Sequence, residues 1–290
     1  MLNSWLDLCI KTAKMPCDIN PGARKILANV HHTFTKVEND LTLQDCGFTK
    51  TKMTLLLKWY YHEESLRIAS GLWDRRRAQK KYGSVGWTTY NHLVKGDIKG
   101  RSKRASVMGP CIQAGTLTWV DKKHYTVDLF YRTTEVFKKF PADLVMIRDH
   151  MLTQFDLSNM TLHSMNFHFA NVTVHPMYFV TTIPHFGMEV FDILEEIKSA
   201  DRYFHDCAVK ATARYVCEEF ARGIAKHMQS QRVKKDVLER IPANLLAPLQ
   251  EYCRQNHPGY KNKYRNIGGA KKFFKDGIAP DDVSKLPKSR

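Results

Sequence analysis

The sequence lacks most of the short motifs that assign an enzyme class directly. It has no Gly-x-Gly-x-x-Gly after a predicted strand and no P-loop, which argues against the common dinucleotide and nucleoside-triphosphate folds. No repeat recurs at a fixed period, and no apolar run approaches the roughly 18 residues of a membrane helix. The first residues lack the basic start and apolar block of a signal peptide. These absences predict a soluble cytoplasmic protein without a membrane partner.

Paired metal-binding or disulfide-forming cysteines are also absent. The 7 cysteines are an odd number and contain no Cys-x-x-Cys pair, which argues against a disulfide framework and a zinc ribbon. The spacing of His163, His168, His175 and His185 matches no usual ligand pattern, so we expect no metal site.

What the chain has in excess is positive charge. Lysine and arginine number 45 against 29 aspartates and glutamates, giving a net charge of +16. Such a chain attracts phosphate, whether on a mononucleotide or on nucleic acid. Residues 259–290 are rich in lysine, glycine and proline and are predicted to form a basic tail, either simply solvated or binding nucleic acid. Residues 1–258 are predicted to form one catalytic domain.

The clearest local structure is a β-hairpin. Residues 116–120 and 125–131 alternate as half-buried strands do, and Asp121-Lys122-Lys123 supplies the turn. Pro141 opens a helix, and residues 164–180 are predicted as a strand. The helical face of that first helix is carried by Leu144, Ile147, Met151 and Phe155.

The rest of the chain is predicted to be mainly helical. Residues 52–61 start a buried helix, 73–81 form a charged helical face, and 83–87 form a glycine-punctuated loop. Further helices are expected at 185–199, 201–229 and 234–255, the last interrupted at Pro242 and Pro248. Strands in the middle with helices before and after predict a mixed α/β or α+β fold.

Three residues carry candidate chemistry. Cys111 follows a proline at the mouth of a strand, and the basic segment 99–104 would favour its thiolate. The hairpin is the right length to return Arg132 to Cys111, and an arginine beside a hydroxyl is a natural phosphate clamp. Asp143 lies in the first turn of the helix opened by Pro141. Taken singly, each also has a structural explanation: a buried thiol, a solvated arginine, and an acid that complements the helix dipole.

Together these residues resemble a known family. Pro110-Cys111, a hairpin, Tyr131-Arg132-Thr133-Thr134-Glu135 and then Asp143 resemble the thymidylate synthase and dCMP hydroxymethylase superfamily, closest to the phage-type deoxycytidylate hydroxymethylases. Ser102-Lys103-Arg104 is similar to the family's Ser-Arg-Arg segment. Landmarks in the same order upstream are Lys58-Trp59-Tyr60, Trp73 and Val85-Gly86-Trp87. The resemblance is specific between Ser102 and Asp143 and looser elsewhere between Lys52 and Val180.

The resemblance implies a fold and a reaction. It implies a single domain with a central mixed sheet, flanking helices and a homodimer formed through the sheet. Cys111 would add to C6 of a pyrimidine deoxynucleoside monophosphate, and C5 would attack the methylene of 5,10-methylenetetrahydrofolate. An aspartate at 143, where thymidylate synthases have asparagine, favours cytosine over uracil, and hence dCMP hydroxymethylase. If the protein is phage-encoded, it would act in the host cytoplasm.

The resemblance also implies roles for other residues. Arg132, Thr133, Lys103 and Arg104 would bind the phosphate, the last two across a dimer, with Arg24 a further candidate. His168 would lie near the sugar, with His175 as the alternative, and Trp87 would line the substrate site.

The sequence departs from the family at its acid/base positions. Leu56 stands where the family has its glutamate, Val85 replaces a tyrosine and Ile112 replaces a histidine. Glu63 or Glu64 is the candidate replacement for the missing carboxylate, since proton transfer is typically worth ~10²–10⁴-fold in rate. Two alternatives stay open: a thymidylate synthase-like variant acting on dUMP, and a basic nucleic-acid-binding protein on a catalytically degenerate fold.

Overall fold

The computed structural model describes residues 2–16, 24–35, 41–42, 46, 63–89, 111–213 and 241–257. The chain divides into two compact units, one of Met1–Thr12 with Lys25–Val174 and the other of Ala13–Arg24 with His175–Arg290. The residues predicted as one domain, 1–258, are therefore shared between two units. The predicted tail, 259–290, lies outside the described residues.

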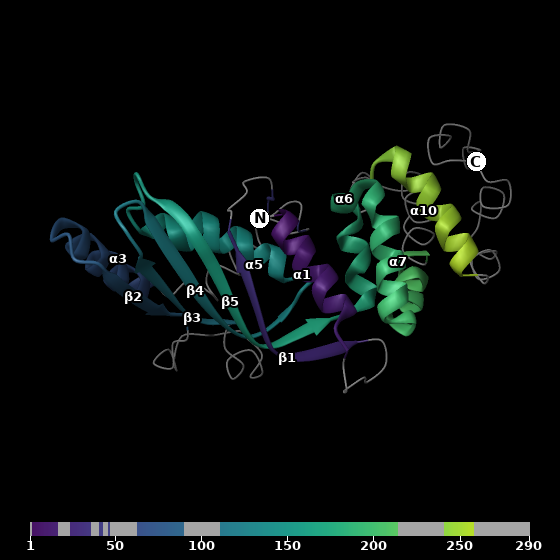
Figure 1. Ribbon diagram of the computed structural model, residues 1–290, viewed down its shortest axis with the longest axis horizontal. Helices are drawn as coiled ribbons and strands as arrows, with labels where there is room; N and C mark the ends of the chain where they lie inside the picture. Colours follow the sequence, from purple (N-terminus) through teal and green to yellow (C-terminus); the bar gives the residue numbers. More distant parts are fainter. Residues whose placement is uncertain are drawn as a thin grey trace, which may run out of the picture. The chain divides into compact units, whose positions relative to one another are not determined.

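A five-stranded mixed sheet forms the first unit (Figure 1), which confirms the predicted mixed α/β class. Its order is β1-β5-β4-β3-β2; β4 and β5 run parallel, and the other neighbours are antiparallel. The strands are β1 (Lys25–Phe34), β2 (Gly83–Thr88), β3 (Ile112–Trp119), β4 (His124–Glu135) and β5 (Thr161–Val174).

The predicted hairpin is confirmed. Strands β3 and β4 pair antiparallel, with Leu117 opposite Val127. The Asp121 carboxylate closes the turn by accepting from the backbone N–H groups of Lys123 and His124, at 2.8 and 3.0 Å. A short acceptor side chain at the start of a turn thus fixes the hairpin register.

The prediction of a loop at 83–87 is wrong, because these residues belong to strand β2. Val85 and Trp87 alternate onto the buried side of the sheet, and their burial outweighs the low strand propensity of the glycines between them. The predicted strand at 164–180 is also shifted. β5 ends at Val174, and Pro176 opens a 3₁₀ helix, Pro176–Thr181, because proline cannot donate to a strand ladder.

The helix opened by Pro141 changes its winding along its length. α5 (Phe140–Met146) passes into a π-helical turn, Ile147–Met151, and a 3₁₀ turn, Leu152–Gln154. The predicted apolar face is nevertheless buried throughout: Leu144, Ile147, Met151 and Phe155. Burial, rather than regular α-helical spacing, holds this segment against the sheet.

α5 covers one face of the sheet through an aromatic cluster (Figure 1). The ring of Phe140 lies 5.1 and 5.3 Å from those of Phe167 and Phe169, and 5.9 Å from Tyr131. Each fully buried aromatic ring contributes ~2–3 kcal/mol of hydrophobic stabilisation. α1 (Leu2–Lys14) is fixed to the same unit because Trp5 Nε1 donates to Val136 O at 2.8 Å.

The opposite face of the sheet is polar. Asp128 accepts from Asn166 Nδ2 at 2.9 Å, and Thr33 Oγ1 donates to Asn166 Oδ1 at 3.0 Å. Phe130 is 42% exposed on this face and stacks on His168, with ring centroids 4.8 Å apart. These cross-strand pairs stabilise the sheet while leaving a partly exposed surface.

The helices agree with the predictions in part. α3 (Glu63–Ala78) includes most of the predicted charged face at 73–81, and the predicted helix at 52–61 lies outside the described residues. In the second unit, α6 (Ile183–Phe186), α7 (Val190–Ala200) and a helix at 202–213 follow the predicted helical regions. α10 (Ala243–Asn256) begins after Pro242 but continues through Pro248. None of the described helices has the length and hydropathy needed to cross a bilayer.

Gly115 is expected to be intolerant of a side chain. A Cβ added there would lie 2.3 Å from Trp87 Cζ2, and the indole cannot retreat because it packs on Phe155. We expect Gly115→Ala to lower the free energy of unfolding by about 2 kcal/mol through overpacking. The matched control is Gly86→Ala, where the nearest atom is 3.6 Å away. Equal effects of the two substitutions in urea denaturation would contradict this account.

Candidate active site at the end of strand β4

Cys111 and Arg132 are neighbours across the β3–β4 pair. The backbone N–H of Arg132 donates to the carbonyl of Cys111 at 2.9 Å. This contact confirms the predicted return of Arg132 to Cys111. Cys111 is a half-buried free thiol, and Arg132 is also half-buried. The basic segment 99–104 that would favour the thiolate lies outside the described residues.

Asp143 reaches the same end of β4 from α5. It faces Thr134, which follows Arg132 by two residues, a strand distance of about 7 Å. Asp143 is only 3% exposed, and within the described part of the chain neither Asp143 Oδ2 nor Thr134 Oγ1 has a partner with hydrogen-bond geometry. A buried polar atom left unpaired costs about 1–3 kcal/mol, so two such atoms facing each other mark a place for a polar ligand group.

Burial changes the charge state of Asp143. Desolvation raises its pKa to about 8, against the weaker opposing effects of the Lys139 ammonium and the Thr134 hydroxyl. At neutral pH the side chain is therefore a neutral carboxylic acid, with one donor and one acceptor. The prediction that Asp143 reads a base edge was based on an ionised carboxylate. The buried acid offers both hydrogen-bonding roles without a charge.

The first turn of α3 is fixed near the Cys111 end of the sheet. Ser65 Oγ accepts from the backbone N–H of Thr88 at 2.9 Å, and the Thr89 hydroxyl donates to the carbonyl of Ile112. Ile112 directly follows Cys111. Glu63 and Glu64 start this helix; Glu64 is exposed, and the Glu63 side chain is outside the described set. The backbone thus brings this turn toward the candidate site.

His168 lies on the polar face of the sheet, opposite the face that α5 and Asp143 cover. Its Nε2 is 3.4 Å from Asp128 Oδ1, and its Nδ1 is 3.0 Å from His31 Nδ1. This network was not predicted. The pairing of β1 with β5 that creates it joins segments more than 130 residues apart in sequence.

The remaining predicted residues are not brought to this end of β4. Thr133 is half-buried beside Arg132. Arg24 and His175 belong to the second unit, where burial and then Arg24 lower the pKa of His175. Leu56, Lys103 and Arg104 lie outside the described residues.

Trp87 and Val85 are core residues. Trp87 is 4% exposed, with its ring 5.3 Å from that of Phe155, and its Nε1 has no partner in the described part of the chain. Val85 is buried beside it and offers no hydroxyl in place of the family's tyrosine. Neither side chain is presented to a ligand at the surface.

Thr134 is the site residue that the sequence analysis quoted without giving it a role. A hydroxyl two residues after Arg132 in a strand, close to a buried acid, was the available signal. Among the described residues, no group of three or more His, Cys, Asp or Glu side chains is arranged to hold a metal ion.

No known protein-family model matches the chain, and no curated protein matches it either. The functional argument therefore depends on the residues themselves. These are a thiol and an arginine joined by a backbone hydrogen bond, with a buried neutral acid a few ångströms along the same strand.

Proposed function

We propose that this protein transfers a one-carbon group to C5 of a pyrimidine nucleotide, with dCMP as the preferred substrate and a hydroxymethyl group as the product. The observation that carries the proposal is the backbone hydrogen bond from Arg132 to Cys111. It places a nucleophile beside a phosphate-binding cation, with Asp143 close by at the end of β4.

Cys111 would supply covalent catalysis. Its thiolate forms a bond to C6 as the C5–C6 π bond breaks, and the electron pair moves to C5. Without a one-carbon donor, C5 takes a proton from water; loss of the original C5 hydrogen and expulsion of the thiolate then restore the base. The net result is exchange of the C5 hydrogen with solvent, so this half of the reaction can be measured by itself.

Asp143 would read the base. As a neutral acid it donates to N3 of cytosine and accepts from the exocyclic amino group, so no proton on the base is needed. The same acid also matches uracil, by accepting from N3–H and donating to O4. This second match keeps dUMP as the alternative substrate, in a thymidylate synthase-like reaction.

Arg132 would hold the phosphate, assisted by the Thr133 hydroxyl, because a guanidinium binds phosphate through paired hydrogen bonds. Lys103, Arg104 and a homodimer that would bring them across remain part of the proposal. The partly exposed Phe130 on the polar face of the sheet supports that face as the dimer contact.

The described residues do not fit the predicted folate. Trp87, the aromatic side chain predicted to line the substrate site, is buried under Phe155 and presents no ring face to a ligand. We therefore derive no step through 5,10-methylenetetrahydrofolate. Glu63 or Glu64, at the start of α3, stays the proposed acid/base group, because that turn is fixed to the Cys111 end of the sheet.

The test is release of tritium from [5-³H]dCMP by the purified protein, with and without methylenetetrahydrofolate. Release from dCMP supports the proposal, and release from dUMP alone would assign the alternative substrate. No release from dCMP, dUMP or CMP under either condition would refute the C5 chemistry.

The pH dependence of substrate binding tests the role of Asp143. Only the protonated acid gives both hydrogen bonds, so KM for C5 exchange should rise about tenfold for each pH unit above about 8. Asparagine cannot ionise, so the Asp143→Asn variant should keep a flat KM over the same range. The same rise in both proteins would assign the pH dependence to another group.

A further inference from the structure

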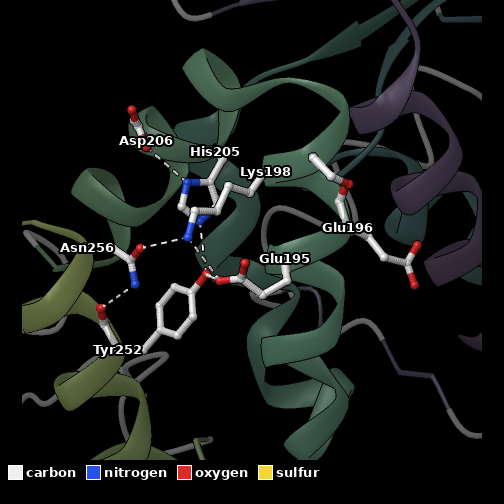
Figure 2. Close-up of polar contacts among 8 residues, drawn as sticks. Glu195, Glu196, Lys198, His205, Asp206, Tyr252 and Asn256 are labelled. Carbon is white, nitrogen blue, oxygen red and sulfur yellow. Dashed lines mark hydrogen bonds and ion pairs between the residues drawn. The ribbon is translucent and has the colours of Figure 1, made fainter.

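The second unit contains a chain of four hydrogen-bonded polar side chains that the proposed reaction does not use (Figure 2). His205 Nδ1 is 3.0 Å from Asp206 Oδ1, and His205 Nε2 is 3.0 Å from the Tyr252 hydroxyl. That hydroxyl lies 2.7 Å from Glu195 Oε1. The chain joins three helical segments: 202–213, α10 and α7.

Proton counting shows what this chain requires. Three hydrogen bonds need three protons, one for each bond. A neutral histidine and a tyrosine supply only two, and ionised Asp206 and Glu195 supply none. The geometry therefore requires one proton more than these groups carry separately at a pH above the ordinary range of histidine.

The surroundings place that extra proton on His205. The pKa of Glu195 is lowered, first by the hydrogen bond from Tyr252 and then by Lys198, so Glu195 is ionised and acts as the acceptor. The pKa of Tyr252 is raised, first by burial and then by Glu195, so the hydroxyl keeps its proton and donates it to Glu195. Both ring nitrogens of His205 must then donate, which makes the ring an imidazolium.

The two ends of the chain differ from its centre in exposure. The His205 side chain is fully buried, whereas Asp206 and Glu195 are 55% and 54% exposed. Lys198, 3.3 Å from Glu195, and the buried Cys253 are the other titratable groups nearby. A proton can therefore enter from solvent through an exposed carboxylate, while the bond that it completes lies in the interior.

We propose that Asp206, His205, Tyr252 and Glu195 form a proton-binding site that locks α10 onto α7 and the 202–213 helix. When the proton is lost, one of the three hydrogen bonds is lost with it. α10 is then held by its apolar side, Leu245, Leu246, Leu249 and Cys253, and by the remaining bonds. The lock is thus closed at neutral pH and loosens under alkaline conditions. The site is independent of the proposed nucleotide chemistry.

The direct test is nitrogen-15 NMR of the histidine rings in the full-length protein near pH 8. The His205 signals are assigned by their loss in His205→Gln. We expect more than half of His205 to be imidazolium, where an ordinary histidine would hold about 3%. A wild-type His205 present as one neutral tautomer would overturn the proposal, whatever the variants do.

Two surface substitutions sharpen this test because each supplies the missing proton from an amide. In Glu195→Gln the amide donates to Tyr252 and the tyrosine donates to Nε2, so the ring becomes neutral with its proton on Nδ1. In Asp206→Asn the amide donates to Nδ1, so the ring becomes neutral with its proton on Nε2. Opposite tautomers in the two variants are expected, and an unchanged imidazolium in either would contradict the proton count.

The matched control is Glu196→Gln. Glu196 neighbours Glu195 on α7 and is 55% exposed, but it pairs with Lys14 at 2.9 Å and stands outside the chain (Figure 2). This variant should keep the wild-type imidazolium. Hydrogen exchange of α10 amides gives a second readout: from pH 7 to 9, protection should fall in the wild type but stay level in Glu195→Gln once intrinsic rates are corrected for. Parallel falls in both proteins would exclude the lock.

Discussion

Asp143→Asn is expected to make the protein more stable at pH 8 than the wild type. The carboxyl has a pKa of about 8 in the folded chain against 3.8 when unperturbed, so between these values the unfolded chain binds fewer protons. The free energy of unfolding of the wild type therefore falls by about 1.4 kcal/mol for each pH unit as pH rises through this window. Asparagine has no such dependence, so its advantage grows to about 5 kcal/mol across the window.

This prediction is checked by urea denaturation of both proteins at several pH values between 4 and 9. Asp192→Asn makes the same chemical change at an exposed site on α7, and we expect it to follow the wild-type pH profile. If the wild type and Asp143→Asn change in parallel with pH, Asp143 is ionised in the folded protein. The argument for a neutral, base-reading acid would then be lost.

Cys111→Ser is expected to reduce C5 tritium release by roughly 10³-fold or more, because a hydroxyl is a far weaker nucleophile than a thiolate. The half-buried side chain changes by one atom, so the fold and nucleotide affinity should be retained. The measurement is tritium release from [5-³H]dCMP together with the Kd for dCMP by calorimetry.

Cys207→Ser provides the control for this substitution, because Cys207 is also a half-buried free thiol but belongs to the second unit. It should release tritium at the wild-type rate. Retained release in Cys111→Ser would show that another group attacks C6 or that the exchange has a different mechanism.

The parts of the fold that could be predicted from the sequence are those set by local patterns. Alternation between Thr116 and Tyr131 predicted the hairpin, and Pro141 predicted the start of α5. Strand β2 was missed because its glycines mimic a loop, although Val85 and Trp87 already alternate. Pro248 was taken as a break, but the apolar side of α10 holds the helix through it.

The candidate site was predictable in its register but not in its electrostatics. The hairpin length was enough to bring Arg132 to Cys111. The neutrality of Asp143 was not readable, because it depends on how completely α5 and β4 remove the carboxyl from water. The proton-binding chain of the second unit was likewise hidden, since its donors and acceptors come from segments about 50 residues apart.

A crystal structure with bound dCMP tests the central claim most directly. The account predicts that C6 of the base lies about 3–3.5 Å from Cys111 Sγ, the range expected of reacting atoms. It also predicts that the N3 and amino edge meets Asp143, and that the phosphate meets Arg132. A nucleotide bound with its base turned away from Cys111, or bound elsewhere on the protein, would contradict it.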